Sequence, residues 1–272
     1  MGCDFSSSPS KRKPIVLAIG RTHGGTVLLD RLENFETLSA FLDFLKQPSI
    51  DHASCVAGFD LPFGLPRAFV EHMNWPLSWP ECMDQFVSHS REELRQFFKA
   101  FCDARPAGFK FAHRATDVPA GSSPSMKWVN PPVAWMMHAG VPLLREAGWT
   151  LPKMLEGDPK RIALEAYPGL LARELVGHRS YKSDDKLKQT PDRWLARKDI
   201  LHGLDMAQTK LKIRLKLSSA QHDNLLADGS GDRLDAVLCM VQAAWAQLQH
   251  ASETAAYGLP DFDPLEGWIL TA

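Results

Sequence analysis

Four aspartates stand at positions from which their carboxylates could act together. Asp4 follows a short apolar start, Asp60 closes the apolar run SCVAGF, and Asp232 and Asp235 open the last helical pattern of the chain. Acids gathered at one end of a sheet would repel one another unless cations neutralised them. Carboxylate oxygens are the hard ligands that Mg²⁺ and Mn²⁺ take, and such a site can hydrolyse phosphodiesters. We therefore predict a catalytic metal site of these four residues with Mg²⁺ or Mn²⁺ as cofactor.

Each of these acids also has an ordinary structural alternative. Asp4 could cap the turn formed by the serines that follow it, and Asp60 could accept backbone donors from the turn after it. Asp232 could be an N-cap, a position that Asp often fills. Asp235 lies one turn into the helix, on the same face as Asp232, and is therefore not the cap.

Three further residues are candidates for the same chemistry. Glu165 lies near a strand end and is expected either to join the catalytic acids or to form a buried pair with Arg114 or Arg173. Arg114, from an irregular segment, and Lys182 are predicted to bind the negative charge of a substrate, although a solvated loop is the default for such positions. The alternatives stay open at this point.

Two longer patterns admit both a binding role and a structural one. The alternating segment KLKIRLKL could place Lys210 to Lys216 against a nucleic-acid backbone, although most charge runs are solvated faces. Trp128, Trp135 and Trp149 could stack on bases, but aromatic clusters more often fill a core, which is the interpretation we favour.

The apolar patterns that must position the acids alternate between strand and helix. Three short strands, over Met1 to Phe5, Ile15 to Ile19 and Thr26 to Leu29, are separated by turn residues and predict an antiparallel unit. A helix over Thr37 to Leu45 and a strand ending at Asp60 follow. The acid at Asp60 is thereby placed at a strand's carboxyl end.

The second half of the chain begins with an interruption. Residues 67–160 are rich in Trp, Pro and Met and predict a mostly helical insertion. After it come a strand over Arg161 to Tyr167, a helix over Leu170 to Val176, a helix from Pro191, and a closing helix over Asp232 to Leu248. The order predicts one α/β domain spanning 1–272, with acids at one end of its sheet.

The composition of the chain argues against several classes of protein. The chain has 272 residues, a formal net charge of −1 and five scattered cysteines without a CxxC pair, which argues against a nucleic-acid coat protein, a disulfide framework and a structural zinc site. No apolar run is long enough for a membrane span and no export signal is evident, so we expect a cytoplasmic protein without a membrane partner. Phosphate-loop, dinucleotide, hydrolase-elbow and zincin motifs are absent.

Several blocks resemble a known family: GCDFSSSP, AGFDLPFGLP, HRATD, LEAYPG, GDRLDAVLC and EGWIL. They are similar to a domain-of-unknown-function family described as predicted RNase H-like nucleases. The resemblance implies an RNase H-like mixed five-stranded sheet flanked by helices, with the helical insertion between its fourth and fifth strands. It also implies a nuclease or phosphodiesterase whose partner is nucleic acid or a nucleotide.

A related pattern occurs in the RuvC-like resolvases, where a first-strand Asp, an acid ending the fourth strand and a D-x-x-D pair on the final helix hold the metals. The resemblance assigns these positions to Asp4, Asp60, Asp232 and Asp235. That group usually has Glu where Asp60 stands, and the shorter side chain changes the reach to a metal. Two other functions stay open: a non-catalytic RNase H-like binding or scaffold protein, and a small-molecule phosphotransferase, which a single domain fits poorly.

Overall fold

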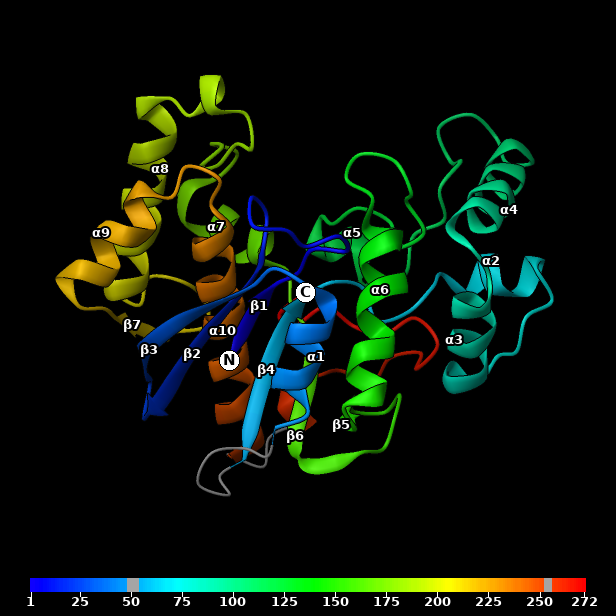
Figure 1. Ribbon diagram of the computed structural model, residues 1–272, viewed down its shortest axis with the longest axis horizontal. Helices are drawn as coiled ribbons and strands as arrows, with labels where there is room; N and C mark the ends of the chain where they lie inside the picture. The colour runs from blue at the N-terminus through cyan, green and yellow to red at the C-terminus, as the bar shows by residue number, and fades with distance from the viewer. Residues whose placement is uncertain (48–53, 252–255) are drawn as a thin grey trace.

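A seven-stranded mixed sheet with the strand order β5-β6-β4-β1-β2-β3-β7 runs through the computed structural model, which describes residues 1–47, 54–251 and 256–272. Helices cover both faces, so the α/β class predicted from the sequence is confirmed (Figure 1). No helix among the described residues has the length and apolar character needed to cross a membrane.

The first three strands form the predicted antiparallel unit. β1 (Gly2–Asp4) pairs with β2 (Ile15–His23), which pairs with β3 (Thr26–Phe35). The last two are longer than expected because the hairpin turns at Gly24, whose φ of 56° suits glycine, and both strands continue up to that turn.

Parallel strands bring the sequence-distant acids to one edge. β4 (Cys55–Asp60) is parallel to β1, and β6 (Asp158–Glu165) is parallel to β4. The register pairs Asp4 with Asp60. The carboxyl ends of all three strands therefore lie at the same edge of the sheet.

The predicted count of five strands is wrong, because two short strands extend the sheet at its edges. β5 (Trp149–Thr150) pairs with β6, and β7 (Arg214–Lys216) pairs with β3. Only three residues of the alternating Lys210 to Lys216 segment are strand, since Lys212 has a φ of 54° that interrupts an extended backbone.

The helices fall into the insertion and the two covering layers, with these bounds: α1 (Leu38–Leu45), α2 (Arg67–His72), α3 (Trp79–Ser88), α4 (Arg91–Asp103), α5 (Asp117–Ala120), α6 (Val133–Glu146), α7 (Pro168–Val176), α8 (Pro191–Asp205), α9 (Ser219–Ala227) and α10 (Asp232–Ala251). Short 3₁₀ turns lie at η2 (Lys186–Lys188) and η3 (Ala256–Gly258). The insertion is mostly helical as predicted, but it contributes strand β5 and ends earlier, because Asp158 already belongs to β6.

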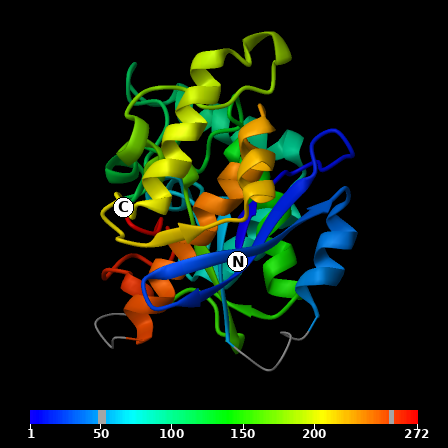
Figure 2. The same ribbon diagram turned by 90° about the vertical axis from the view of Figure 1, so that its left-hand side faces the viewer.

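The period of two along β2 divides the core between the two faces. Ile15 and Leu17 pack with α1 and α6, whereas Val16 and Ala18 pack with α7, α8 and α10. Figure 2 shows α1 and α10 on opposite sides of the sheet. Trp135 and Trp149 are buried in the first of these cores, and Trp128 packs against it, which confirms the core interpretation of the tryptophans.

α10 lies directly against the strands that end in acids. A Cβ on Gly2 would stand 2.0 Å from the backbone nitrogen of Met240, and one on Gly58 would stand 2.7 Å from the carbonyl oxygen of Cys239. Only glycine leaves room for this approach of helix backbone to β1 and β4. The close packing brings the start of α10 to the edge where Asp4 and Asp60 end their strands.

Candidate functional site

The four predicted aspartates gather at one end of the sheet. Asp4 and Asp60 are neighbours at the ends of β1 and β4, and Asp232 and Asp235 lie in the first turn of α10. Burial raises the pKa of Asp4 well above its ordinary value, and the charges of Asp235, Asp232 and Asp60 add to that rise. The residues are thus close enough to repel one another.

The pKa values of Asp60 and Asp232 are raised by the same surroundings. Burial raises the pKa of Asp60 to about 7, Lys182 opposes that rise, and Asp235 adds to it. Burial also raises the pKa of Asp232, against the influence of Lys13. Carboxyls whose pKa values are shifted by burial and by neighbouring charges are typical of functional sites.

Asp235 is the most deeply placed acid of the group. Its side chain is fully buried, its Oδ1 accepts a hydrogen bond of 2.5 Å from the Tyr181 hydroxyl, and its Oδ2 accepts one from the Lys182 ammonium. Burial and the charge of Asp235 raise the pKa of Tyr181 well above its ordinary value. Lys182 thus supplies an internal positive charge to the acid cluster.

Asp232 does not serve as the N-cap of α10. The helix begins at Asp232 itself, and the backbone N–H of Arg233 is capped by Asp228, whose Oδ2 accepts it at 2.9 Å. The Ser230 hydroxyl donates to Asp232 Oδ2 at 3.1 Å. The other oxygen of this carboxyl accepts no hydrogen bond from the part of the chain that the structure describes.

Asp4 and Asp60 present the oxygens that best suit a cation. Both side chains are partly exposed, and no donor among the described residues forms a hydrogen bond with either carboxylate. Their hard oxygens fit Mg²⁺ or Mn²⁺ in donor type. Within the described ranges, however, no group of three or more His, Cys, Asp or Glu side chains is arranged to hold a metal ion. Asp235 itself is turned towards Tyr181 and Lys182.

Arg114 does not reach the site, and the prediction that it binds substrate is wrong. It is 2% exposed, and its guanidinium donates to Asp117, Glu165 and a backbone carbonyl. These contacts use all five of its N–H groups. A side chain with no exposed donor cannot pair with a phosphate.

Glu165 forms the buried pair with Arg114 that was one of its two alternatives. Its Oε1 accepts from Nη2 at 2.7 Å, and its Oε2 accepts from Nη1 at 2.8 Å and from the Phe63 backbone N–H at 3.0 Å. Burial raises the pKa of Glu165, and Arg114 opposes the rise. With both oxygens engaged, Glu165 stabilises the end of β6, and the structure does not support its place among the catalytic acids.

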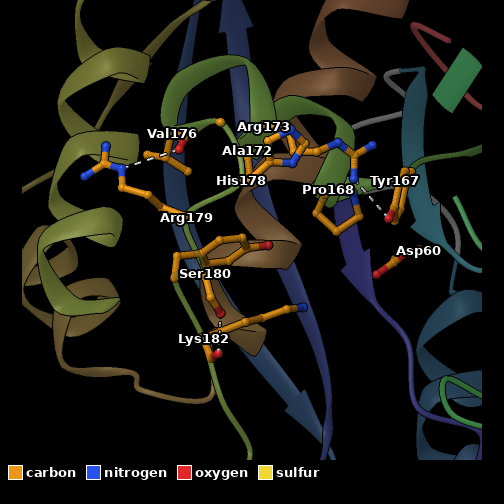
Figure 3. A pocket seen from close by; sticks show the side chains of 13 residues that line it. Asp60, Tyr167, Pro168, Ala172, Arg173, Val176, His178, Arg179, Ser180 and Lys182 are labelled. Carbon is orange, nitrogen blue, oxygen red and sulfur yellow. Dashed lines mark hydrogen bonds between the residues drawn. The ribbon is translucent and has the colours of Figure 1, made fainter. Parts of the chain in front are cut away.

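A cavity of about 290 Å³ opens beside the acids, between α7 and the segment 177–182. Asp60 and Lys182 point into it from opposite sides, and Tyr167 and Pro168 form another part of its wall (Figure 3). Tyr181 also lines it. The cavity adjoins the acid cluster, because Asp60 belongs to both and because Tyr181 and Lys182 contact Asp235.

Two residues of this region were missed by sequence reasoning as site residues. Tyr181 holds Asp235 from a position 54 residues away in the chain, and Arg173 lines the cavity from the last turn of α7. Neither belongs to a motif. The one available signal was the pair Tyr181 and Lys182, an aromatic next to a cation in a segment without helical or strand periodicity.

The chain was compared with protein-family models, with curated proteins and with solved structures, and none of the three comparisons found a match, so the family resemblance of the sequence blocks stays a prediction.

Proposed function

We propose that the protein is a divalent-metal-dependent phosphodiester hydrolase, a nuclease or phosphodiesterase, that uses Mg²⁺ or Mn²⁺. One observation carries this proposal: Asp4 and Asp60, adjacent at two parallel strand ends, have raised pKa values and carboxylates without a hydrogen bond, and face further acids from α10. A divalent cation would relieve the repulsion among these groups.

Asp4 and Asp60 would hold the ion, with Asp232 beside them and Asp235 available once its bond to Lys182 is exchanged. A bound divalent ion supplies positive charge that activates a water and stabilises the leaving oxygen of a phosphodiester. Lys182 is 42% exposed and has donors beyond the one used by Asp235. In this proposal its ammonium turns from the acid to a substrate phosphate.

The strand order supports the RNase H-like form of this proposal. Without its two short edge strands the sheet has the order β6-β4-β1-β2-β3. In it β2 is antiparallel to both β1 and β3, whereas β4 is parallel to β1 and β6 is parallel to β4. This arrangement suits the RNase H-like resemblance and its acid positions. We include nucleic acid or a nucleotide as substrate, and the cytoplasm as location, in the same proposal.

Calorimetric titration of Mn²⁺ into the wild type, Asp4→Asn and Asp60→Asn tests the metal site, followed by cleavage of labelled single- and double-stranded DNA and RNA. Asp103→Asn is the matched control, because this exposed acid of α4 is paired with Lys99 and does not line the cavity or belong to the acid cluster. We expect binding and cleavage in the wild type and the control, and loss of both in the two site variants. Cleavage that survives in Asp4→Asn and Asp60→Asn would end the proposal.

A binding protein without catalysis is the second candidate, favoured by the ion pair of Lys182 with Asp235. In that case the chain's own lysine is the permanent counterion of the acids, and no metal is required. Titration separates the two functions: a wild type that takes up no Mn²⁺ at millimolar concentration, yet binds nucleic acid or a nucleotide, fits the binding protein alone.

A further inference from the structure

The cavity between α7 and the segment 177–182 has an uneven distribution of charge. Three of its lining residues are cations, Arg173, Arg179 and Lys182, whereas Asp60 is its one acid within the described residues. Arg179 is paired with Asp199 at 2.8 Å, and Lys182 is paired with Asp235. Arg173 is the cation of this wall that forms no ion pair with a carboxylate in the described part of the chain.

Arg173 is held in place by neutral groups. Its Nη2 donates to the carbonyl of Ala120, its Nη1 donates to the Tyr167 hydroxyl at 3.3 Å, and its guanidinium lies 5.2 Å from the centre of the Tyr167 ring. A partly buried guanidinium fixed in this way keeps its charge and has donors left over. Such a group is suited to a bidentate contact with a phosphate.

The cavity offers more than a place for an anion. Its volume of about 290 Å³ is close to the lower end of the range for small-molecule sites, about 300 to 1,000 Å³. The ring of Tyr167 together with Pro168, Ala172 and Val176 gives it apolar walls beside the cations. A ligand that combines a phosphate with a sugar or a base matches this mixture.

We propose that the cavity binds one nucleotide unit of the substrate, with its phosphate against Arg173 and Lys182 and its nucleoside against Tyr167 and Pro168. This inference rests on the proposed function for its choice of a phosphodiester, because Asp60 is shared by the cavity and the acid cluster (Figure 3). A nucleotide in this place has its ester linkage next to Asp60. The cavity thus selects the unit that adjoins the reacting phosphate.

The test measures binding without metal, so that it does not depend on catalysis. Nucleoside 5′-monophosphates, inorganic phosphate and a short single-stranded oligonucleotide are titrated in EDTA into wild type, Arg173→Met and the control Arg95→Met. Arg95 is an exposed residue of α4 that pairs with Glu92, away from the cavity residues, and its loss changes the net charge equally. A second variant, Ser180→Phe, narrows the cavity at an exposed position, where folding is expected to be unaffected.

We expect monophosphates to bind the wild type and Arg95→Met alike, to bind Arg173→Met about tenfold to a hundredfold more weakly, and to lose affinity for Ser180→Phe. Stronger binding of the oligonucleotide would identify a strand as the source of the unit, and binding of the mononucleotide alone would identify a free nucleotide; both support the inference. Inorganic phosphate that binds as tightly as the monophosphates would overturn it, as would unchanged affinity in both Arg173→Met and Ser180→Phe.

The two proposals fail in different ways. A wild type that cleaves with Mn²⁺ but binds no nucleotide in EDTA refutes the cavity and leaves the metal site intact. A wild type that binds nucleotides through Arg173 but takes up no Mn²⁺ refutes the hydrolase and leaves the cavity as a nucleotide site.

Discussion

Replacing Asp60 by Asn should make the metal-free protein more stable at neutral and alkaline pH. The folded state raises the pKa of Asp60 from 3.8 to about 7, chiefly by burial, so the folded protein holds this proton more tightly than the unfolded chain does. The wild type therefore loses stability as the pH rises from about 4 to about 7, and the loss is complete above that range. Asn carries no charge and avoids this loss.

The size of the effect follows from the two pKa values. The interval from 3.8 to about 7, at about 1.4 kcal/mol per pH unit, sets a ceiling of roughly 4 kcal/mol. Asp60 is partly exposed and its charge interacts with that of Asp4, and both circumstances reduce the effect. We expect Asp60→Asn to gain about 2 to 4 kcal/mol over the wild type at pH 8, and the gain to vanish near pH 4.

Urea unfolding of wild type and variant in EDTA, at intervals from pH 4 to pH 8.5, measures the difference directly. Asp263→Asn provides a control of opposite sign, because hydrogen bonds from Arg67 lower the pKa of Asp263 and its charge stabilises the folded state above the unfolded pKa. That variant should be less stable than the wild type throughout this pH range, because the stabilisation from the Asp263 charge is lost only below about pH 4. A free-energy difference between wild type and Asp60→Asn that is flat across the range would refute the assigned environment of Asp60.

Three further substitutions test contacts around the site. Glu165→Gln removes a charge from a buried ion pair and should cost about 3 to 5 kcal/mol in urea unfolding at pH 7, and a cost under about 1 kcal/mol would contradict its structural role. Lys182→Met leaves the buried Asp235 without its cation and should cost about 2 to 3 kcal/mol in EDTA, less than a fully buried pair because the lysine is 42% exposed; Mn²⁺ should restore more stability to this variant than to the wild type. Gly2→Ala places a Cβ 2.0 Å from the Met240 nitrogen and should lower the midpoint of thermal unfolding by many degrees; a midpoint equal to that of the wild type would disprove the close packing.

The sequence was sufficient where a feature depends on local pattern. The helix predicted over Thr37 to Leu45 is α1, with Thr37 as its cap, and β2 and β3 begin at the residues that the preceding turns indicated, although both strands run further than predicted. The position of Asp60 at a strand end also followed from the apolar run before it and the Pro and Gly after it. Each of these features depends on residues that are close together in the sequence.

Features that depend on distant partners were not predictable in the same way. Arg114 looked available for a substrate because its segment has no regular pattern, yet Glu165, 51 residues away, and the backbone of Glu266, 152 residues away, take its donors. Likewise β7 exists because β3 offers an edge to pair with, and three residues then suffice. In both cases tertiary contacts, which one sequence does not display, decide the outcome.

The contact of α10 with Gly2 and Gly58 has a consequence for how the site can adapt. The two glycines let the backbone of α10 lie directly against β1 and β4, so the three elements that carry the four aspartates are packed together as one unit. The opposite wall of the cavity is different, since residues 177–185 contain neither helix nor strand. We therefore expect changes in ligand preference to come from residues 177–185, whereas the close packing of the α10 backbone on β1 and β4 fixes the spacing of the carboxylates.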